Sequence, residues 1–161
     1  MVFLDTSALV KAYVEERGTE SVRGLLARGD TELFLSKHVA LETLATFAYK
    51  LRDQQITTRR YREIRADFYA TYQRYNVVPV TDDTIETAID LADQHRKLGV
   101  GSVDLIHVAT ALEIQARVPE TPLTIICADR SMRLLARAAG FEVFDPETDD
   151  VARLGVPPDE A

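Results

Sequence analysis

The sequence has few of the features that would assign it to a specialised class of protein. Its 161 residues contain one cysteine and no tryptophan. Cys127 therefore has no partner for an internal disulfide, and its place at the end of the apolar run from Leu123 favours a small buried side chain over a reactive thiol. No run approaches the roughly 18 apolar residues of a membrane span, and Asp5 comes too early for a secretory signal. We therefore expect a cytoplasmic protein without a membrane partner.

Positive charge is also scarce. The 19 lysines and arginines are outnumbered by 26 aspartates and glutamates, which leaves a net charge of −7. This balance argues against a protein that coats nucleic acid through bulk electrostatics. Contact with a nucleic acid would have to be local, through a few arginines or through metal ions that offset acidic residues. The hydrophobic share of 46% and the charged share of 28% are typical of a compact globular protein, and the length suits one domain.

Short apolar runs alternate with segments of helical periodicity along the whole chain. Strands are predicted at residues 2–4, 32–35, 77–80, 123–127 and 142–144. The predicted helices cover residues 8–14, 19–26, 36–51, 57–75, a stretch from 82 or 83 to the break at 98–101, 103–115 and 129–139. Such alternation predicts an α/β protein whose parallel sheet carries helices on both faces. Residues 1–145 form the predicted domain, and residues 146–161 a proline-containing acidic tail.

Four acidic residues have positions that suit a cation site. Asp5 and Asp129 follow the first and fourth predicted strands, and ligands of a parallel sheet bind beyond the carboxyl ends of its strands. Asp104 lies in the first turn of a helix that Ser102 is predicted to cap, and Glu42 lies on the helix after the second strand. Hard divalent cations such as Mg²⁺ take carboxylate oxygens as ligands. Each acid taken alone is better explained as a helix cap or a solvated side chain than as a metal ligand, because caps are common.

The residues around these acids resemble a known family. Val2-Phe-Leu-Asp5-Thr-Ser-Ala-Leu9, Ser102-Val-Asp104-Leu-Ile-His-Val-Ala-Thr-Ala111 and Ile125-Ile-Cys-Ala-Asp129-Arg-Ser-Met resemble the segments that carry the first, third and fourth acids of PIN-domain nucleases. Leu41-Glu42 lies where the second acid of that family would fall. The resemblance spans roughly residues 1–145, and the compact size is most similar to VapC-type toxins of bacterial and archaeal toxin–antitoxin pairs.

The resemblance implies a fold, a site and an activity. The fold would be a five-stranded parallel sheet in the order 3-2-1-4-5. Asp5, Glu42, Asp104 and Asp129 would hold Mg²⁺ or Mn²⁺, with Thr6 as a supporting hydroxyl. The activity would be endonucleolytic hydrolysis of RNA by a metal-activated water. The partners would be the RNA and a cognate antitoxin, and a homodimer is expected because dimers are the commonest assembly.

Several other residues have two readings. His107 lies three residues after Asp104, on the same helical face, but its apolar neighbours favour a packed histidine over a ligand. Arg130 and Arg133 share a helix face beside Asp129 and would either grip RNA phosphates or face solvent. Ser102 would cap its helix, contact substrate, or both. A run of arginines and tyrosines would either clamp RNA or pack a helix against its neighbours. Its residues are Arg59, Arg60, Tyr61, Arg62, Arg65, Tyr69, Tyr72 and Tyr75.

Two other functions fit the same sequence. The chain would be either a PIN-type nuclease of RNA processing or DNA repair outside a toxin system, or a module that mainly binds another protein through apolar helix grooves.

Overall fold

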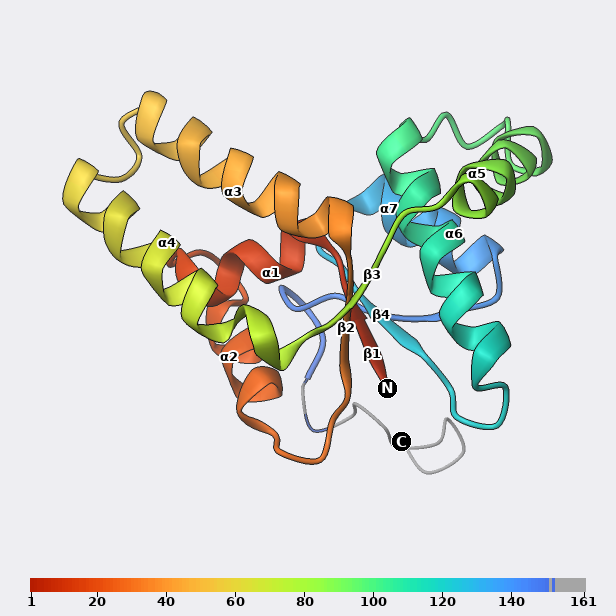
Figure 1. Cartoon of the computed structure of the whole chain (residues 1–161), viewed down its shortest axis with the longest axis horizontal. Helices are drawn as coiled ribbons and strands as arrows, with labels where there is room; N and C mark the ends of the chain where they lie inside the picture. Colours follow the sequence, from red (N-terminus) through yellow and green to blue (C-terminus); the bar gives the residue numbers. More distant parts are fainter. Residues whose placement is uncertain (151, 153–161) are drawn as a thin grey trace.

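A five-stranded parallel sheet forms the centre of the molecule (Figure 1). The computed structural model describes residues 1–150 and residue 152. The strands lie in the order β3-β2-β1-β4-β5, and every neighbouring pair is parallel, as predicted. Their bounds are β1 (Val2–Leu4), β2 (Leu33–Ser36), β3 (Asn76–Val78), β4 (Thr124–Ile126) and β5 (Glu142–Phe144).

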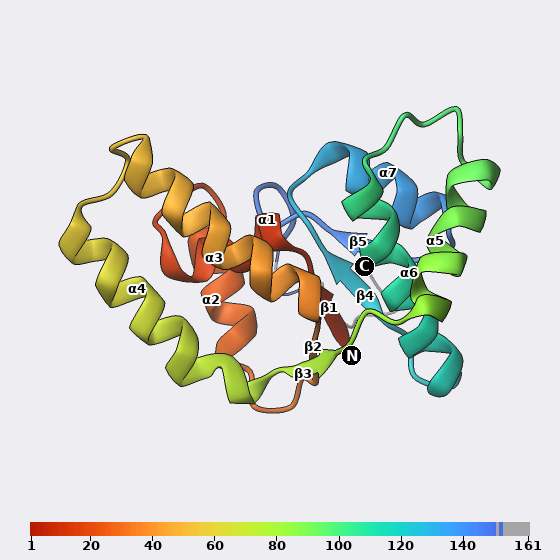
Figure 2. The same cartoon turned by 45° about the horizontal axis from the view of Figure 1, so that its top comes forward.

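Helices cover both faces of the sheet. Figures 1 and 2 show α1 to α4 gathered on one side and α5 to α7 on the other. In the described part of the chain the helices are α1 (Thr6–Tyr13), α2 (Thr19–Ala27), α3 (Lys37–Arg52), α4 (Thr58–Thr71), the short 3₁₀ helix η1 (Tyr72–Arg74), α5 (Asp82–Gln94), α6 (Ser102–Arg117) and α7 (Arg130–Ala138).

The order of the strands places a switch point between β1 and β4. From β1 the chain moves outward to β2 and β3, and it then returns to the other side of β1 to form β4 and β5. Right-handed crossovers in opposite directions put the two sets of helices on opposite faces. At such a point the connections leave the sheet in opposite directions, which opens a crevice beyond the carboxyl ends of β1 and β4.

The core lies on both faces of the two central strands. Phe3, Leu4, Ile125 and Ile126 are fully buried, as expected for strands covered by helices on either side. On the α1–α4 side an aromatic cluster joins three helices, with ring centroids of Tyr13 and Phe47 5.6 Å apart and those of Phe47 and Phe68 6.3 Å apart. Apolar packing therefore holds α1, which follows Asp5, against α3, which carries Glu42.

Some predicted boundaries differ from the structure. The third strand ends at Val78, before Pro79, because proline has no amide hydrogen for the ladder. The helix predicted over residues 57–75 ends at Thr71, and a 3₁₀ turn follows. Helix α5 is capped by Thr81, through reciprocal hydrogen bonds with Thr84, and not by Asp82 or Asp83. Among the described residues no helix is long and apolar enough to span a membrane.

The residues after β5 fold back onto the domain. Asp145 and Pro146 are buried, and the amides of Thr148 and Asp149 donate to the carbonyl of Asp145, which makes a compact turn. The rest of the predicted tail, residues 151 and 153–161, lies outside the described residues.

Candidate active site

Four carboxylates from different parts of the chain line one pocket at the switch point. Asp5 directly follows β1 and Asp129 comes shortly after β4, while Asp104 lies in the first turn of α6 and Glu42 in the first half of α3. The open pocket has a volume of about 520 Å³. The structure therefore brings together all four acids that the sequence singled out, although they are spread over more than a hundred residues.

Ser7 holds Asp5 and joins the two central strands. One oxygen of Asp5, Oδ2, accepts hydrogen bonds from the backbone amide of Ser7 at 3.0 Å and from its hydroxyl at 2.6 Å. The same hydroxyl oxygen accepts from the amides of Ala128 at 2.9 Å and Asp129 at 3.2 Å. The end of β1 is thus tied to the segment after β4, which sets the separation of Asp5 and Asp129.

Glu42 is held by donors from two other helices. Its Oε2 accepts from the Thr6 hydroxyl and from His107 Nε2, both at 2.8 Å. Since a carboxylate only accepts, Nε2 of His107 donates to Glu42, while Nδ1 of the same ring lies 3.2 Å from the buried hydroxyl of Ser36. Burial opposes ionisation of Glu42, but the bonds from His107 and Thr6 outweigh it, so the pKa of Glu42 lies below its usual value.

Asp104 and Asp129 share one hydroxyl group but differ in their electrostatics. Ser131 Oγ lies 2.6 Å from Asp129 Oδ1 and 3.3 Å from Asp104 Oδ2. Burial and then the charges of Asp129 and Asp5 raise the pKa of Asp104. For Asp129 the weak burial is outweighed by the hydrogen bonds from Ser131 and the Met132 amide, and its pKa is lowered. Ionisation of Asp104 is therefore opposed by its surroundings, whereas ionisation of Asp129 and Glu42 is favoured.

Each of the four carboxylates leaves one oxygen uncommitted. The described residues donate to Oδ2 of Asp5, Oε2 of Glu42, Oδ2 of Asp104 and Oδ1 of Asp129, and to no second oxygen of any of them. His107 Nε2 lies 3.8 Å from the second oxygen of Asp5, Oδ1, which is too far for a hydrogen bond. As the side chains stand, no three His, Cys, Asp or Glu among the described residues are arranged to hold a metal ion. The donor chemistry suits a hard cation: oxygens alone, mutual repulsion, and an open oxygen on each acid.

Ser7, His107 and Ser131 are among the site residues that reasoning from the sequence missed. His107 is 1% exposed, so it is packed as predicted, yet its ring also contacts Glu42. Its position three residues after Asp104 was the available signal. For Ser131 the signal was its place two residues after Asp129, where a hydroxyl at the start of a helix faces the capping carboxylate.

Other predicted site residues lie apart from the acids or are engaged elsewhere. Ser102 does not cap α6: Gly101 is the capping residue, without a side-chain bond, because the chain is already helical at Ser102. The Arg133 guanidinium donates to the Ala128 carbonyl and forms a 2.6 Å ion pair with Asp145. Arg130 is exposed at the first position of α7 and has no ion pair within the described part of the chain.

The arginine and tyrosine stretch mostly stabilises helices. Arg60 donates to the Tyr13 carbonyl at the end of α1, and the Arg59 side chain pairs with Glu63 one turn along α4. Arg65 stacks over the rings of Tyr61 and Tyr69. These contacts are those of a helix packed against its neighbours.

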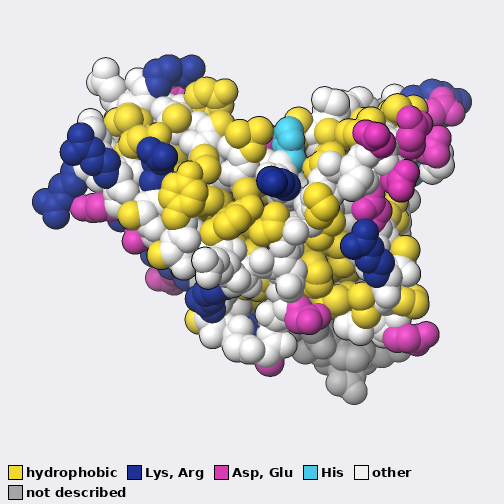
Figure 3. All heavy atoms as spheres, viewed as in Figure 1, with side chains coloured by type: hydrophobic (Ala, Val, Ile, Leu, Met, Phe, Trp, Pro, Cys, Tyr) yellow, Lys and Arg dark blue, Asp and Glu magenta, His cyan; other side chains and the backbone are white. Residues whose placement is uncertain are grey.

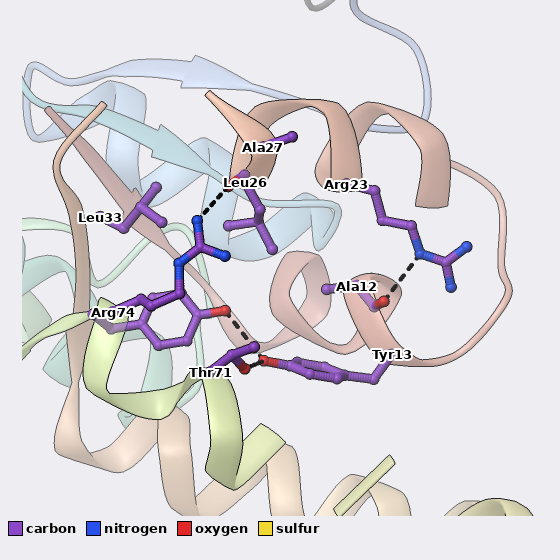
Figure 4. Close-up of a pocket in the computed structure, with 9 residues that line it drawn as sticks. Ala12, Tyr13, Arg23, Leu26, Ala27, Leu33, Thr71 and Arg74 are labelled. Atoms are coloured by element: carbon purple, nitrogen blue, oxygen red, sulfur yellow. Dashed lines mark hydrogen bonds between the residues drawn. The ribbon is translucent and has the colours of Figure 1, made fainter. Parts of the chain in front are cut away.

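A smaller pocket, formed by α1, α2, β2 and the segment around η1, is a structural joint. Figure 4 shows Arg23 and Arg74 turned toward the carbonyls of Ala12 and Leu26, which lie in the last turns of α1 and α2. The Tyr13 hydroxyl bonds with Thr71 at 2.6 Å. Because these polar groups satisfy one another or helix ends, the pocket is explained by folding alone.

Cys127 is buried beside the site without a reactive environment. Its sulfur lies 3.3 Å from Asp5 Oδ2 and 3.6 Å from the Ser7 hydroxyl. Burial and the Asp5 charge raise the pKa of the thiol far above its usual value. A thiolate nucleophile is therefore disfavoured here.

Comparison with known proteins gives a family and a set of similar folds. The PIN domain profile matches residues 2–138. No curated protein sequence matches the chain.

Three solved structures illustrate the structural similarity. FitAcB from Neisseria gonorrhoeae has a TM-score of 0.70 at 17% identity over 92% of this chain and 100% of that one. The Mycobacterium tuberculosis toxin VapC20, described as cleaving the sarcin–ricin loop, has a TM-score of 0.62 at 21% identity, over 88% and 96%. A toxin–antitoxin complex from Klebsiella pneumoniae has a TM-score of 0.59 at 15% identity, over 91% and 98%. At such identities the likeness shows a shared fold.

Proposed function

Because the chain belongs to the PIN domain family, whose profile covers residues 2–138, we propose that it is a metal-dependent endoribonuclease and the toxin of a VapBC-type toxin–antitoxin pair. The observation that carries the proposal is the convergence of Asp5, Glu42, Asp104 and Asp129 on one pocket, each with one oxygen free of hydrogen bonds from the described residues. RNA as the substrate is supported by the similarity of the fold to VapC20.

The four acids would hold Mg²⁺ or Mn²⁺. When bound, such an ion supplies a Lewis acid that polarises the phosphodiester and lowers the pKa of a water molecule. The chain itself contributes position and charge. Ser7 fixes Asp5, while His107 and Thr6 keep Glu42 ionised and turned toward the pocket. Water would be the nucleophile, and the 3′ oxygen would leave and take a proton, so the products would carry a 5′ phosphate and a 3′ hydroxyl.

An apolar groove on the α3–α4 side is the proposed docking surface for the antitoxin. Figure 3 shows hydrophobic side chains gathered along α3 and α4 and toward β3. The groove is about 590 Å³ in volume and is lined by Leu41, Leu44, Phe68, Tyr69, Tyr72 and Pro79 among others. Leu41 is 63% exposed and Tyr69 is 54% exposed, which is unusual for side chains of this size so close together. The complex from Klebsiella pneumoniae has the same fold.

The proposal also includes a homodimer. Ile85 and Ile89 lie one turn apart on α5 and are 37% and 56% exposed. An apolar stripe of this kind is suited to a two-fold contact with its own copy.

The test is cleavage of a single-stranded RNA by the purified chain with Mn²⁺, with the chemistry of the new ends determined. We expect Asp5→Asn and Asp104→Asn to reduce the rate at least about 100-fold, in the range seen for loss of a metal-site carboxylate. Asp90→Asn is the matched control, since Asp90 is an exposed acid on α5 that does not line the pocket. Undiminished cleavage by both site variants, or ends that carry a 2′,3′-cyclic phosphate, would overturn the proposed chemistry.

The toxin assignment has its own test. Expression of the chain alone should arrest bacterial growth, and co-expression of its cognate antitoxin should restore it. Substitution of Leu41 and Tyr69 by serine should abolish that rescue while cleavage persists. Growth unaffected by the active chain would favour a nuclease of RNA processing or DNA repair.

A further inference from the structure

The pocket of the four acids has a second wall, which contains two lysines paired with two glutamates. Among the described residues, Lys11 and Lys50 are the lysines or arginines that line it. Lys11 is 4% exposed, an uncommon state for a lysine. Its Nζ lies 2.7 Å from Glu147 Oε1 and 3.4 Å from Glu16 Oε2. Lys50 pairs with the other oxygen of Glu16, and its Nζ is 3.3 Å from Gln55 Oε1.

Four separate segments of the chain build this lysine wall. Lys11 lies in the last turn of α1, Lys50 in the last turn of α3, and Glu16 in the loop between α1 and α2. Glu147 belongs to the turn that follows β5. Packing brings these two buried or half-buried ammonium groups to the edge of the pocket of the four acids. Lysines that only keep a protein soluble lie on the open surface, so these two call for another role.

The turn with Glu147 is fastened on both sides. Asp145 Oδ2 forms the 2.6 Å ion pair with Arg133 of α7, and the carbonyl of Glu147 accepts from Arg17 Nε at 3.2 Å. Gly18, at φ 86°, lies so close to the turn that a Cβ atom there would be 2.6 Å from the Pro146 carbonyl oxygen. The glutamate is therefore held against Lys11 by the fold, and does not reach it by chance from a mobile side chain.

We propose that Lys11 and Lys50 bind a backbone phosphate of the RNA beside the scissile phosphate, and that Glu16 and Glu147 hold the two ammonium groups ready for it. This inference rests on the proposed nuclease function and adds the residues that attract its substrate. A chain of net charge −7 with four acids in its pocket repels a polyanion, so positive charge is needed next to those acids.

The hydrogen-bond count leaves room for the phosphate. An ammonium group has three donors. Lys11 uses two on Glu147 and Glu16, and Lys50 uses two on Glu16 and Gln55. By this count one donor on each lysine has no acceptor among the described residues, and we assign that donor to the phosphate oxygen. The glutamates keep the lysines in place but also lower the positive potential that they present.

This division of roles gives opposite expected effects for the two kinds of residue. Lys11→Gln and Lys50→Gln should each weaken binding of a fluorescein-labelled single-stranded RNA by about 5- to 10-fold, in line with loss of one phosphate contact. The slope of log affinity against log salt concentration should fall by up to about 0.7, the value for one phosphate of a single strand. Glu147→Gln should tighten binding about 2- to 5-fold, because a neutral acceptor holds Lys11 without cancelling its charge.

The experiment measures binding by fluorescence anisotropy in EDTA at several salt concentrations, and cleavage of the same RNA with Mn²⁺, on the full chain. Lys97→Gln is the matched control, because Lys97 is exposed in the segment between α5 and α6 and does not line the pocket. Lys11→Arg retains the charge and should retain the affinity. Thermal melts identify a variant that fails to fold, and Lys50→Gln then carries the test, since Lys50 is less buried than Lys11.

The outcomes separate this inference from the nuclease proposal. Loss of RNA affinity in the lysine variants, with a raised KM and a nearly unchanged kcat, supports the inference. Unchanged affinity and salt slope in both lysine variants would overturn it even if the wild-type chain cleaves RNA. Weaker binding by Glu147→Gln, in proportion to a lower melting temperature, would also overturn it and assign the ion pairs to stability alone. A wild-type chain that binds RNA through the lysines but never cleaves it would refute only the nuclease proposal.

Discussion

At the scale of single residues, Asp104 shows how function is built at the expense of stability. Burial and the neighbouring Asp129 and Asp5 raise the pKa of Asp104, and the one hydrogen bond that it accepts from the described residues, from Ser131, is long at 3.3 Å. A carboxyl group whose pKa is higher in the folded state than in the unfolded chain destabilises the fold once it is ionised. This cost is present at neutral pH and disappears as the pH falls below the raised pKa.

Asp104→Asn should therefore abolish cleavage and stabilise the protein. The amide removes the repulsion from Asp129 and Asp5, and we expect a gain of about 1 kcal/mol in the free energy of unfolding at pH 7.5, a usual size for a relieved active-site strain. The gain should shrink as the pH is lowered, because Asp104 of the wild type then becomes protonated. Urea denaturation at several pH values measures it, with Asp90→Asn as the control. A variant less stable than wild type at pH 7.5 would contradict the electrostatic reading.

His107 has the opposite role, because it supports an ionised acid. Replacement by Phe removes the donor to Glu42 and leaves the fully buried Ser36 hydroxyl without its hydrogen-bond partner on the ring. We expect a loss of about 1–3 kcal/mol in the free energy of unfolding, the cost of an unsatisfied buried polar group. The lowered pKa of Glu42 stabilises the fold above its unfolded pKa and ceases to do so as the pH falls through the folded value.

The pH profile of cleavage gives the decisive measurement for His107. Without its main donor Glu42 should have a higher pKa, so the acidic limb of the rate profile should move to higher pH in His107→Phe. His107→Gln keeps a side-chain donor, so its acidic limb should lie at a pH between those of His107→Phe and the wild type. An acidic limb that stays in place would show that His107 acts on Glu42 only through packing.

At the scale of elements, two of the site acids are also helix caps. Asp5 accepts from the Ser7 amide at the start of α1, and Asp129 accepts from the Met132 amide at the start of α7. The sequence allowed a capping role or a cation-binding role for each. In the structure the capping bond occupies one carboxylate oxygen and points the other away from it, so the helix start itself orients the acid. Both roles belong to the same side chain.

The caps also give a prediction on stability. Thr57 caps α4 through the Arg60 amide, whereas Ser102 makes no side-chain capping bond on α6. Thr57→Ala should cost about 1 kcal/mol, the usual worth of an N-cap hydroxyl. Ser102→Ala should change the free energy of unfolding by less than about 0.5 kcal/mol, as for most exposed positions. Chemical denaturation of both variants checks this, and equal losses would restore the cap that the sequence predicted for Ser102.

At the scale of the whole molecule, the acidic charge predicts a dependence on divalent cations. An ion that binds the folded chain and not the unfolded one stabilises it in proportion to the logarithm of its concentration above the dissociation constant. We expect Mn²⁺ or Mg²⁺ to raise the melting temperature of the wild type, and Asp104→Asn to lose most of that rise. EDTA should abolish cleavage and excess Mn²⁺ should restore it. KCl of equal ionic strength is the control, and an equal effect of KCl would reduce the result to general screening.

Much of the architecture could be predicted from the sequence, because it depends on near neighbours. Apolar runs of three to five residues, helical periodicity and Gly or Pro breaks indicated five strands, their parallel pairing and helices on both faces. Acids just after the first and fourth strands indicated where a cation would bind, and the resemblance added the strand order and Glu42. The errors, such as the cap of α6 and the ends of β3 and α4, amount to one to four residues at element ends, where local signals compete.

What only the tertiary structure decided is which side chains meet across long stretches of chain. His107 reaches Glu42 over 65 residues, and Lys11 reaches Glu147 over 136. Neither contact has a periodicity that a sequence pattern can display, because each depends on how two crossovers pack on opposite sides of β1. The sequence by itself determined the elements and the acids at their ends. Packing decided that a histidine supports Glu42 and that the pocket has a wall of lysines, since these distances follow from the fold and not from spacing along the chain.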